Sequence, residues 1–313
     1  MVFAAIAPHG GLAVAEACTP DELTLAAVTR AGMEELGRAF KSAKPEVVVI
    51  ATPHNVHIGG AFAVLVAGRV AGNLEGTTEL VALDVPCETD LAWLVLEALV
   101  NDGLPALGVS FGSNDPSAAV APMDWGVLIP LWFMGGRHEP PLPVVVMSPA
   151  RDLSPAEHVR AGAAVASAAA KSRRRVAFIA SADHGHAHHP DGPYGFHPNA
   201  KVYDELVRDL VKKDRLQGLI DIPGALVEQA KADSWWQMLM LLGATGEGWR
   251  GRLISYEAPT YFGMLTAAYV PESPHPHGAA ARRDRTSPRR REEAIRGTSS
   301  RPRTRTPRQT RPR

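Results

Sequence analysis

Three short apolar segments constrain the fold of this chain more than any other feature. They occupy residues 2–7, 46–51 and 175–181, and their interiors contain only Ala, Val, Ile and Phe. Strands without polar alternation are typically buried on both faces, as in a parallel sheet that helices cover on each side. We also expect strands at 104–110, 142–148 and 253–256, and a strand or hairpin arm at 61–70.

Helix patterns alternate with these strands. Thr19 and Ser154 each precede a Pro and are followed three residues later by Glu, which is the sequence of a capping box. We therefore expect helices at 19–44, 89–101 and 154–172, and two more within 199–213 and 223–242. The alternation predicts an α/β fold, a single domain with a mostly parallel central sheet flanked by helices.

Charge is divided unevenly along the chain. Residues 271–313 contain 13 Arg and 4 acidic residues, a net charge of +9, so residues 1–270 carry −9 of a total of zero. The segment 271–313 has no apolar periodicity, and we expect a disordered Arg- and Pro-rich tail after a folded domain at 1–270. Such tails bind polyanions without specificity and the domain itself is acidic, so we expect no nucleic-acid function.

Cysteine content and the N-terminus indicate the compartment. The two cysteines, Cys18 and Cys87, are too few for a cysteine-rich metal site or a disulfide scaffold, and they fit a reducing compartment. The first residues lack the basic region of a signal peptide, and no run of 18 apolar residues occurs. We therefore expect a cytoplasmic protein with no membrane partner.

Histidines follow the three apolar segments. His9 follows the first, His54 the second, and His184 and His186 the third. The carboxyl ends of parallel strands meet at one edge of a sheet, which is where such sheets bind ligands. A single His in a turn is more often a surface residue, but imidazoles that converge with a carboxylate suit a divalent cation. The ligand types alone leave open an iron oxygenase and a zinc hydrolase.

Sequence motifs surround these histidines. They read Ala7-Pro8-His9-Gly10-Gly11, Thr52-Pro53-His54-Asn55, Ser181-Ala182-Asp183-His184-Gly185-His186 and Pro193-Tyr194-Gly195, with Glu257 near the end of the domain. In order and spacing, over residues 1–270, the chain resembles the class III extradiol ring-cleavage dioxygenases, the family of the catalytic subunit of protocatechuate 4,5-dioxygenase.

The resemblance implies a metal centre and a reaction. In that family the first two histidines and the late glutamate bind Fe(II), so His9, His54 and Glu257 are the expected ligands, with Mn(II) and Zn(II) as alternative metals. His186 is the expected catalytic acid and base. The implied reaction is extradiol cleavage of an ortho-dihydroxy or aminohydroxy aromatic ring. The implied partners are a small aromatic substrate and O2, in a homo-oligomer or with a small second subunit.

The chain departs from the family pattern at Asp124-Trp125-Gly126. Relatives often have His at the middle position, whereas an indole offers only an N–H donor and an apolar face. We predict that Trp125 borders the metal cavity, and that the substrate differs from a simple catechol or that His57 or His184 replaces the missing histidine. The superfamily includes Memo-like proteins without established ring cleavage, so a metal-pocket binding protein stays an alternative.

Overall fold

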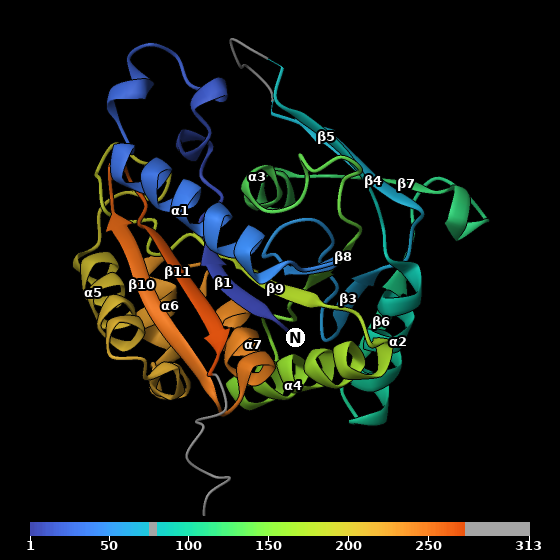
Figure 1. Cartoon of the computed structure of the whole chain (residues 1–313). Helices are drawn as coiled ribbons and strands as arrows, with labels where there is room; N and C mark the ends of the chain where they lie inside the picture. Colours follow the sequence, from blue (N-terminus) through green and yellow to red (C-terminus); the bar gives the residue numbers. More distant parts are fainter. Residues whose placement is uncertain (75–79, 273–313) are drawn as a thin grey trace, which may run out of the picture. The chain divides into compact units, whose positions relative to one another are not determined.

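The computed structural model describes residues 1–74 and 80–272, which form one compact unit around a central sheet (Figure 1). The sheet has eight strands in the order β10 (Trp249–Glu257), β11 (Met264–Pro271), β1 (Phe3–Ala7), β9 (Val176–Ser181), β2 (Val47–Ala51), β8 (Val144–Ser148), β3 (Phe62–Leu65) and β6 (Ala106–Val109). A smaller sheet contains β5 (Ala82–Pro86), β4 (Arg69–Asn73) and β7 (Val120–Pro122).

The central strands β1, β9, β2 and β8 are parallel, and every residue in them is buried. Alternate side chains of β1 enter different cores. Ala4 and Ile6 contact one hydrophobic cluster, whereas Phe3, Ala5 and Ala7 contact another. A core on each face explains the uninterrupted apolar sequence of these strands and confirms the predicted α/β class.

Helices form both covering layers. Residues of α1 (Ala27–Ala43) and α3 (Trp125–Phe133) belong to one core, and residues of α2 (Thr89–Asn101), α4 (Pro155–Ser172), α5 (Pro198–Lys212), α6 (Gly224–Ala230) and α7 (Trp235–Thr245) belong to the other. Helices α4 and α7 pack very closely. A Cβ atom at Gly162 would overlap the carbonyl of Met240, and one at Gly243 would overlap the carbonyl of Val159. These two glycines therefore allow α7 to pack directly against α4.

Several expected elements differ in the structure. The strand or hairpin arm expected at 61–70 is two strands in different sheets, β3 and β4. The Thr19 capping box forms, with mutual hydrogen bonds between Thr19 and Glu22, but it opens only the 3-10 turn Glu22–Thr24. Helix α1 begins later, because Ala26 has a left-handed backbone conformation (φ 53°). The strand β11 and the helix α3 were not expected.

The helix expected within 223–242 is interrupted. Helix α6 ends before Lys231, whose backbone is left-handed (φ 54°), and α7 begins at Trp235. The interruption turns residues 231–234 toward the carboxyl edge of the central sheet, where Asp233 lies against His9. This local break determines the composition of the site.

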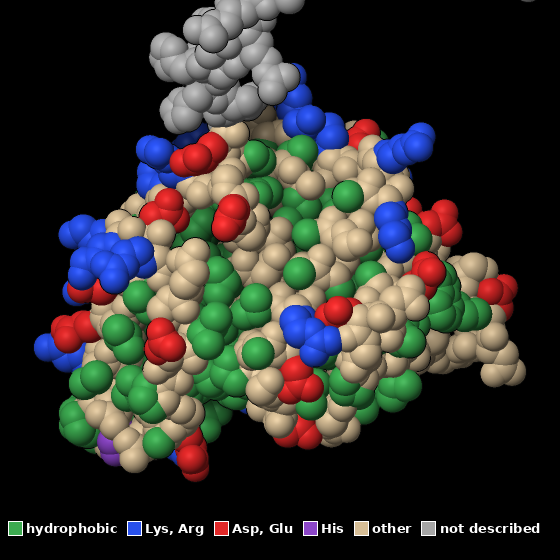
Figure 2. Space-filling model, turned by 90° about the horizontal axis from the view of Figure 1, so that it is seen from below, with side chains coloured by type: hydrophobic (Ala, Val, Ile, Leu, Met, Phe, Trp, Pro, Cys, Tyr) green, Lys and Arg blue, Asp and Glu red, His purple; other side chains and the backbone are tan. Residues whose placement is uncertain are grey.

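The face seen from below carries basic and acidic side chains interspersed with apolar ones (Figure 2). Cys18 and Cys87 are both free. Within the described residues, each helix is too short or too polar to cross a bilayer. The expected tail at 271–313 lies, from residue 273 onward, outside the described residues.

Candidate metal centre

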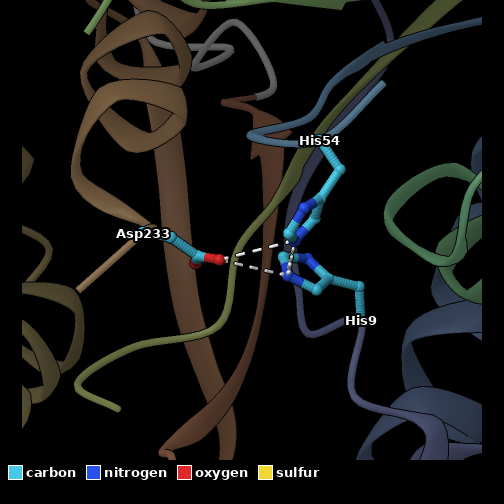
Figure 3. A group of neighbouring side chains, drawn as sticks. All are labelled: His9, His54 and Asp233. Carbon is cyan, nitrogen blue, oxygen red and sulfur yellow. Dashed lines mark hydrogen bonds and ion pairs between the residues drawn. The ribbon is translucent and has the colours of Figure 1, made fainter. Parts of the chain in front are cut away.

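His9, His54 and Asp233 meet at the carboxyl edge of the central sheet (Figure 3). His9 follows β1 and His54 follows β2, two strands separated only by β9. Asp233 approaches from the opposite side, on the connection between α6 and α7. Three segments that are distant in the sequence therefore supply two imidazoles and one carboxylate to one point.

The ligand atoms are close enough to share one ion. The two Nε2 atoms of His9 and His54 lie 3.2 Å apart, and Asp233 Oδ2 lies 3.5 Å from the first and 3.6 Å from the second. Metal–ligand bonds of about 2.0–2.2 Å place neighbouring ligand atoms roughly 3–3.5 Å apart. The other Asp233 oxygen, Oδ1, is buried with no hydrogen-bond partner among the described residues. Distances, ligand types and this unpaired oxygen all fit a divalent cation.

The tautomer of His9 follows from its neighbour Ser181. The Ser181 hydroxyl has one proton, and it donates that proton to the carbonyl oxygen of Gly126 at 2.5 Å. The same Oγ lies 2.9 Å from His9 Nδ1, so Nδ1 must be the donor in that contact. When the ring is neutral, the His9 Nε2 atom therefore carries the lone pair that could bind a metal.

The charged groups around His9 and Asp233 favour a positive charge at this site. Burial by itself lowers the pKa of His9, but the carboxylates of Asp183 and Asp233 outweigh it and raise the pKa to about 9. Burial also opposes ionisation of Asp233, yet His9 and His54 hold its pKa well below the usual range. The Asp183 carboxylate accepts a hydrogen bond from the backbone N–H of His9 at 3.0 Å, which orients the start of the loop.

Glu257 does not lie with the two histidines. Its Oε1 accepts a hydrogen bond from the backbone N–H of Thr29, in the first turn of α1. Ala26, at the start of α1, has no side chain that could serve as a cap, and an acceptor at a helix N-terminus is stabilising. We expected Glu257 as the third ligand, whereas in this geometry the carboxylate beside the two imidazoles is Asp233.

Sequence reasoning missed Asp233 for a physical reason. In the segment Ala232-Asp233-Ser234 the acid precedes an apolar helix, and there it has the pattern of an ordinary helix cap. It also falls inside the range expected to be one continuous helix. The apolar faces of residues 224–230 and 235–245 are separate, and this could have indicated a break between two helices. The sequence alone does not reveal how the two faces are oriented.

His186 lies next to the cluster and is partly buried. Its ring stacks on Phe262, with centroids 5.4 Å apart and planes at 16°. Its Nδ1 donates to the carbonyl oxygen of His184 at 2.7 Å, because a carbonyl can only accept. The Nε2 atom is therefore the unprotonated nitrogen when the ring is neutral, and it is available to accept a proton.

The three weaker site expectations have different outcomes. Trp125 lines a cavity together with His9 and Asp183, and its ring lies 4.6 Å from that of His54. His57 lines a second cavity, with Nε2 donating to the Pro53 carbonyl at 2.6 Å. His184 is fully buried beside Tyr203 and is not among the residues that line either cavity.

Two cavities reach the candidate metal centre. One has a volume of about 630 Å³ and contains His57, Arg151 and Lys231 in its wall. The other has a volume of about 720 Å³ and contains His9 and Trp125. Four residues line both: His54, His186, Tyr194 and Asp233. The two cavities therefore meet at the candidate metal centre.

Comparisons with known proteins give the relationships of the chain. Protein CA_C1420 of Clostridium acetobutylicum is 23% identical over 252 residues, which are 80% of this chain and 53% of that protein. The chain thus spans about half the length of this curated relative. The solved structure of the uncharacterized protein JW3007 of Escherichia coli K12 has a TM-score of 0.57 at 18% identity, over 86% of this chain and 99% of that one, and shows the shared fold.

A family match covers almost all of the described domain. Residues 3–266 match the family described as the catalytic LigB subunit of aromatic ring-opening dioxygenase. The match includes His9, His54, His186 and Asp233. The chain therefore belongs to the family of the catalytic LigB subunit of aromatic ring-opening dioxygenase.

Proposed function

We propose that the chain is a dioxygenase that opens an ortho-dihydroxy or aminohydroxy aromatic ring by extradiol cleavage, using O2 and Fe(II). In this proposal His9, His54 and Asp233 hold the metal, and Mn(II) or Zn(II) are the alternative ions. The observation that carries it is the convergence of two imidazole nitrogens and one carboxylate oxygen within 3.2–3.6 Å. Family membership supports the reaction class.

The ligand set suits this chemistry. His9, His54 and Asp233 would hold the ion and leave other coordination positions open for further ligands. When bound, the metal would lower the pKa of substrate hydroxyl groups and bring substrate and dioxygen into one site. Contacts within the protein would position these ligands. Ser181 orients His9, and the loop between α6 and α7 brings Asp233 to the two imidazole rings.

His186 is our candidate for the acid and base. The hydrogen bond from its Nδ1 to the His184 carbonyl leaves Nε2 free, and Phe262 restricts rotation of the ring. Nε2 would accept a proton from the substrate hydroxyl and return it as the ring opens, a role that suits an imidazole near neutral pH. Because His186 lines both cavities, substrate bound at the metal-binding side chains lies within its reach.

Trp125 would contribute to substrate placement. Its side chain is about half exposed (51%) and its ring is tilted against that of His54. The adjacent Gly126 permits this approach, because a Cβ atom there would come within 3.0 Å of the His54 ring. An exposed indole beside the metal site can stack on an aromatic ring but cannot transfer a proton.

The test is anaerobic loading of the protein with Fe(II), followed by a screen of catechols and aminophenols. We expect oxygen uptake with at least one compound and a yellow ring-opened product. Parallel samples with Mn(II) and Zn(II), with metal content measured in each, identify the active ion. Hydrolysis with Zn(II) and no oxygen uptake with any metal would identify a zinc hydrolase instead. Metal or ligand binding without any turnover would favour a Memo-like binding protein.

A further inference from the structure

The two cavities differ in their chemistry. The first contains two cationic side chains, Arg151 and Lys231, against the single carboxylate of Glu228 apart from Asp233 itself. The second contains no lysine or arginine among its lining residues, and its acidic groups are Glu22, Asp183 and Asp233. An anionic group is therefore attracted by the first cavity and repelled by the second.

Arg151 is held in position as a part of the cavity wall. Its guanidinium lies over the ring of Trp236, 4.9 Å from the centroid, and it donates a hydrogen bond to the Pro53 carbonyl at 3.2 Å. The Trp236 indole N–H donates in turn to the Arg151 carbonyl at 3.1 Å. A planar cation fixed in this way loses little freedom when it binds a carboxylate. Lys231 projects from the same break that carries Asp233.

The second cavity has an apolar wall. Leu12, Leu25, Ile129 and Phe262 contribute to it together with the half-exposed Trp125. Leu25 and Trp125 leave large apolar surfaces in contact with solvent, 37% and 51% exposed. Apolar surface gathered at the mouth of a cavity is typical of a place where a ligand is bound.

The two cavities are larger than a single aromatic ring requires. Each cavity, at about 630 or 720 Å³, lies within the roughly 300–1,000 Å³ of a complete small-molecule site. A one-ring catechol at their junction would leave most of both cavities filled with water. Resting on the function proposed above, we propose that the substrate is an elongated aromatic compound with two arms. Its dihydroxy ring lies at the metal centre, an anionic arm extends to Arg151 and Lys231, and an apolar arm extends along Leu25 and Trp125.

The test measures binding to the metal-loaded full chain without oxygen, by calorimetry. Four probes share a catechol ring: one has a propionate arm, one a phenyl arm, one both arms on opposite sides, and one both arms with propionamide in place of propionate. We expect the two-armed acid to bind about tenfold or more tighter than either one-armed probe, and the amide to lose about tenfold. Equal affinities across the series would overturn the proposal.

Variants assign the arms to the cavities. Arg151→Gln and Lys231→Gln should weaken the two acids and leave the phenyl probe and the amide unchanged. Leu25→Ala should weaken only the probes that carry a phenyl arm. Arg38→Gln and Lys41→Gln, exposed cations on α1, are the matched controls and should bind all four probes like the wild type. All five positions are exposed at the surface, so the variants are expected to fold. If Arg151→Gln weakened the binding of the acid and of the amide equally, the assignment of Arg151 to the anionic arm would be contradicted.

The same probes separate this proposal from the proposed function. If the two-armed acid binds tightest and Fe(II)-loaded protein consumes no oxygen with any probe, the function fails and the assignment of the cavities stands. If oxygen is consumed equally well with one-armed and two-armed probes, and their affinities are equal, the function stands and the two-armed substrate is excluded.

Discussion

Ser181 determines the tautomer of His9. Its only hydroxyl proton goes to the Gly126 carbonyl, so its oxygen must accept from His9 Nδ1. Hydrogen bonds of this kind, one residue behind a ligand, orient the imidazole and increase its basicity. The relationship links the end of β9 to the candidate metal centre through a single side chain.

The first prediction concerns this hydrogen bond. Ser181→Ala should lower the affinity for Fe(II) or Zn(II) by about 10- to 100-fold, because His9 loses the partner that holds its lone pair toward the metal. Titration with a competing chelator measures the change. Ser172→Ala, on the partly buried end of α4, is the control and should bind metal like the wild type. An unchanged affinity in Ser181→Ala would show that the tautomer does not matter.

A second prediction compares Asp233 with Glu257. Asp233→Ala should reduce metal affinity by more than the roughly 100-fold upper range for residues that only support a ligand. Glu257→Ala should keep the metal but lower the free energy of unfolding by about 1 kcal/mol, because the N-terminus of α1 loses its acceptor. Metal analysis and chemical denaturation of the two variants give opposite patterns. Loss of metal in Glu257→Ala with retention in Asp233→Ala would restore the ligand set implied by resemblance.

The third prediction separates acid–base chemistry from metal binding. His186→Ala should retain the metal while turnover falls by about 10²–10⁴-fold, because no group replaces Nε2 as proton acceptor. Metal content and turnover are measured together. Loss of the metal itself would make His186 a ligand.

Trp125 provides the fourth prediction. Trp125→His should alter the ranking of substrates more than it alters metal affinity, because the indole contacts His54 by its ring and offers no ligand atom. Relative turnover over a panel of catechols and aminophenols, measured beside metal titrations, tests this. Trp93→His, an exposed residue on α2, controls for loss of an indole elsewhere. The same ranking in Trp125→His and wild type would remove Trp125 from substrate selection.

The fifth prediction is a pH dependence of the metal-free protein. The pKa of His9 in the folded protein, about 9, lies above its ordinary value of 6.5. A raised folded pKa adds stability that is fully present below pH 6.5 and is lost as the pH rises through 9. The stability difference between wild type and His9→Gln should therefore shrink between pH 6.5 and 9.5 in denaturant titrations with chelator present. A stability difference that does not change with pH would contradict the raised pKa of His9.

Much of the fold could be predicted because the relevant information is local. The apolar composition of β1, β2 and β9 directly predicts that both faces of each strand are buried. The α4 capping box is likewise formed by Ser154 and Glu157 within one turn. The helix at 89–101 begins and ends where its pattern does. The sequence did not show that β3 and β4 belong to different sheets, because the sheet that a strand joins depends on partners distant in the sequence.

The positions of His9 and His54 follow from the sequence, since each comes directly after a strand whose place in a parallel sheet is fixed by its apolar character. The identity of the carboxylate beside these histidines does not follow from it. Asp233 and Glu257 are both acids near the ends of elements, and only the packing of α7 on α4 and the contact of Glu257 with α1 direct one carboxylate to the imidazoles and the other to a helix end. Strand burial and caps are properties of neighbouring residues, and the sequence by itself determined them. Convergence of a carboxylate from residue 233 on residues 9 and 54 depends on long-range packing, and the tertiary structure alone decided it.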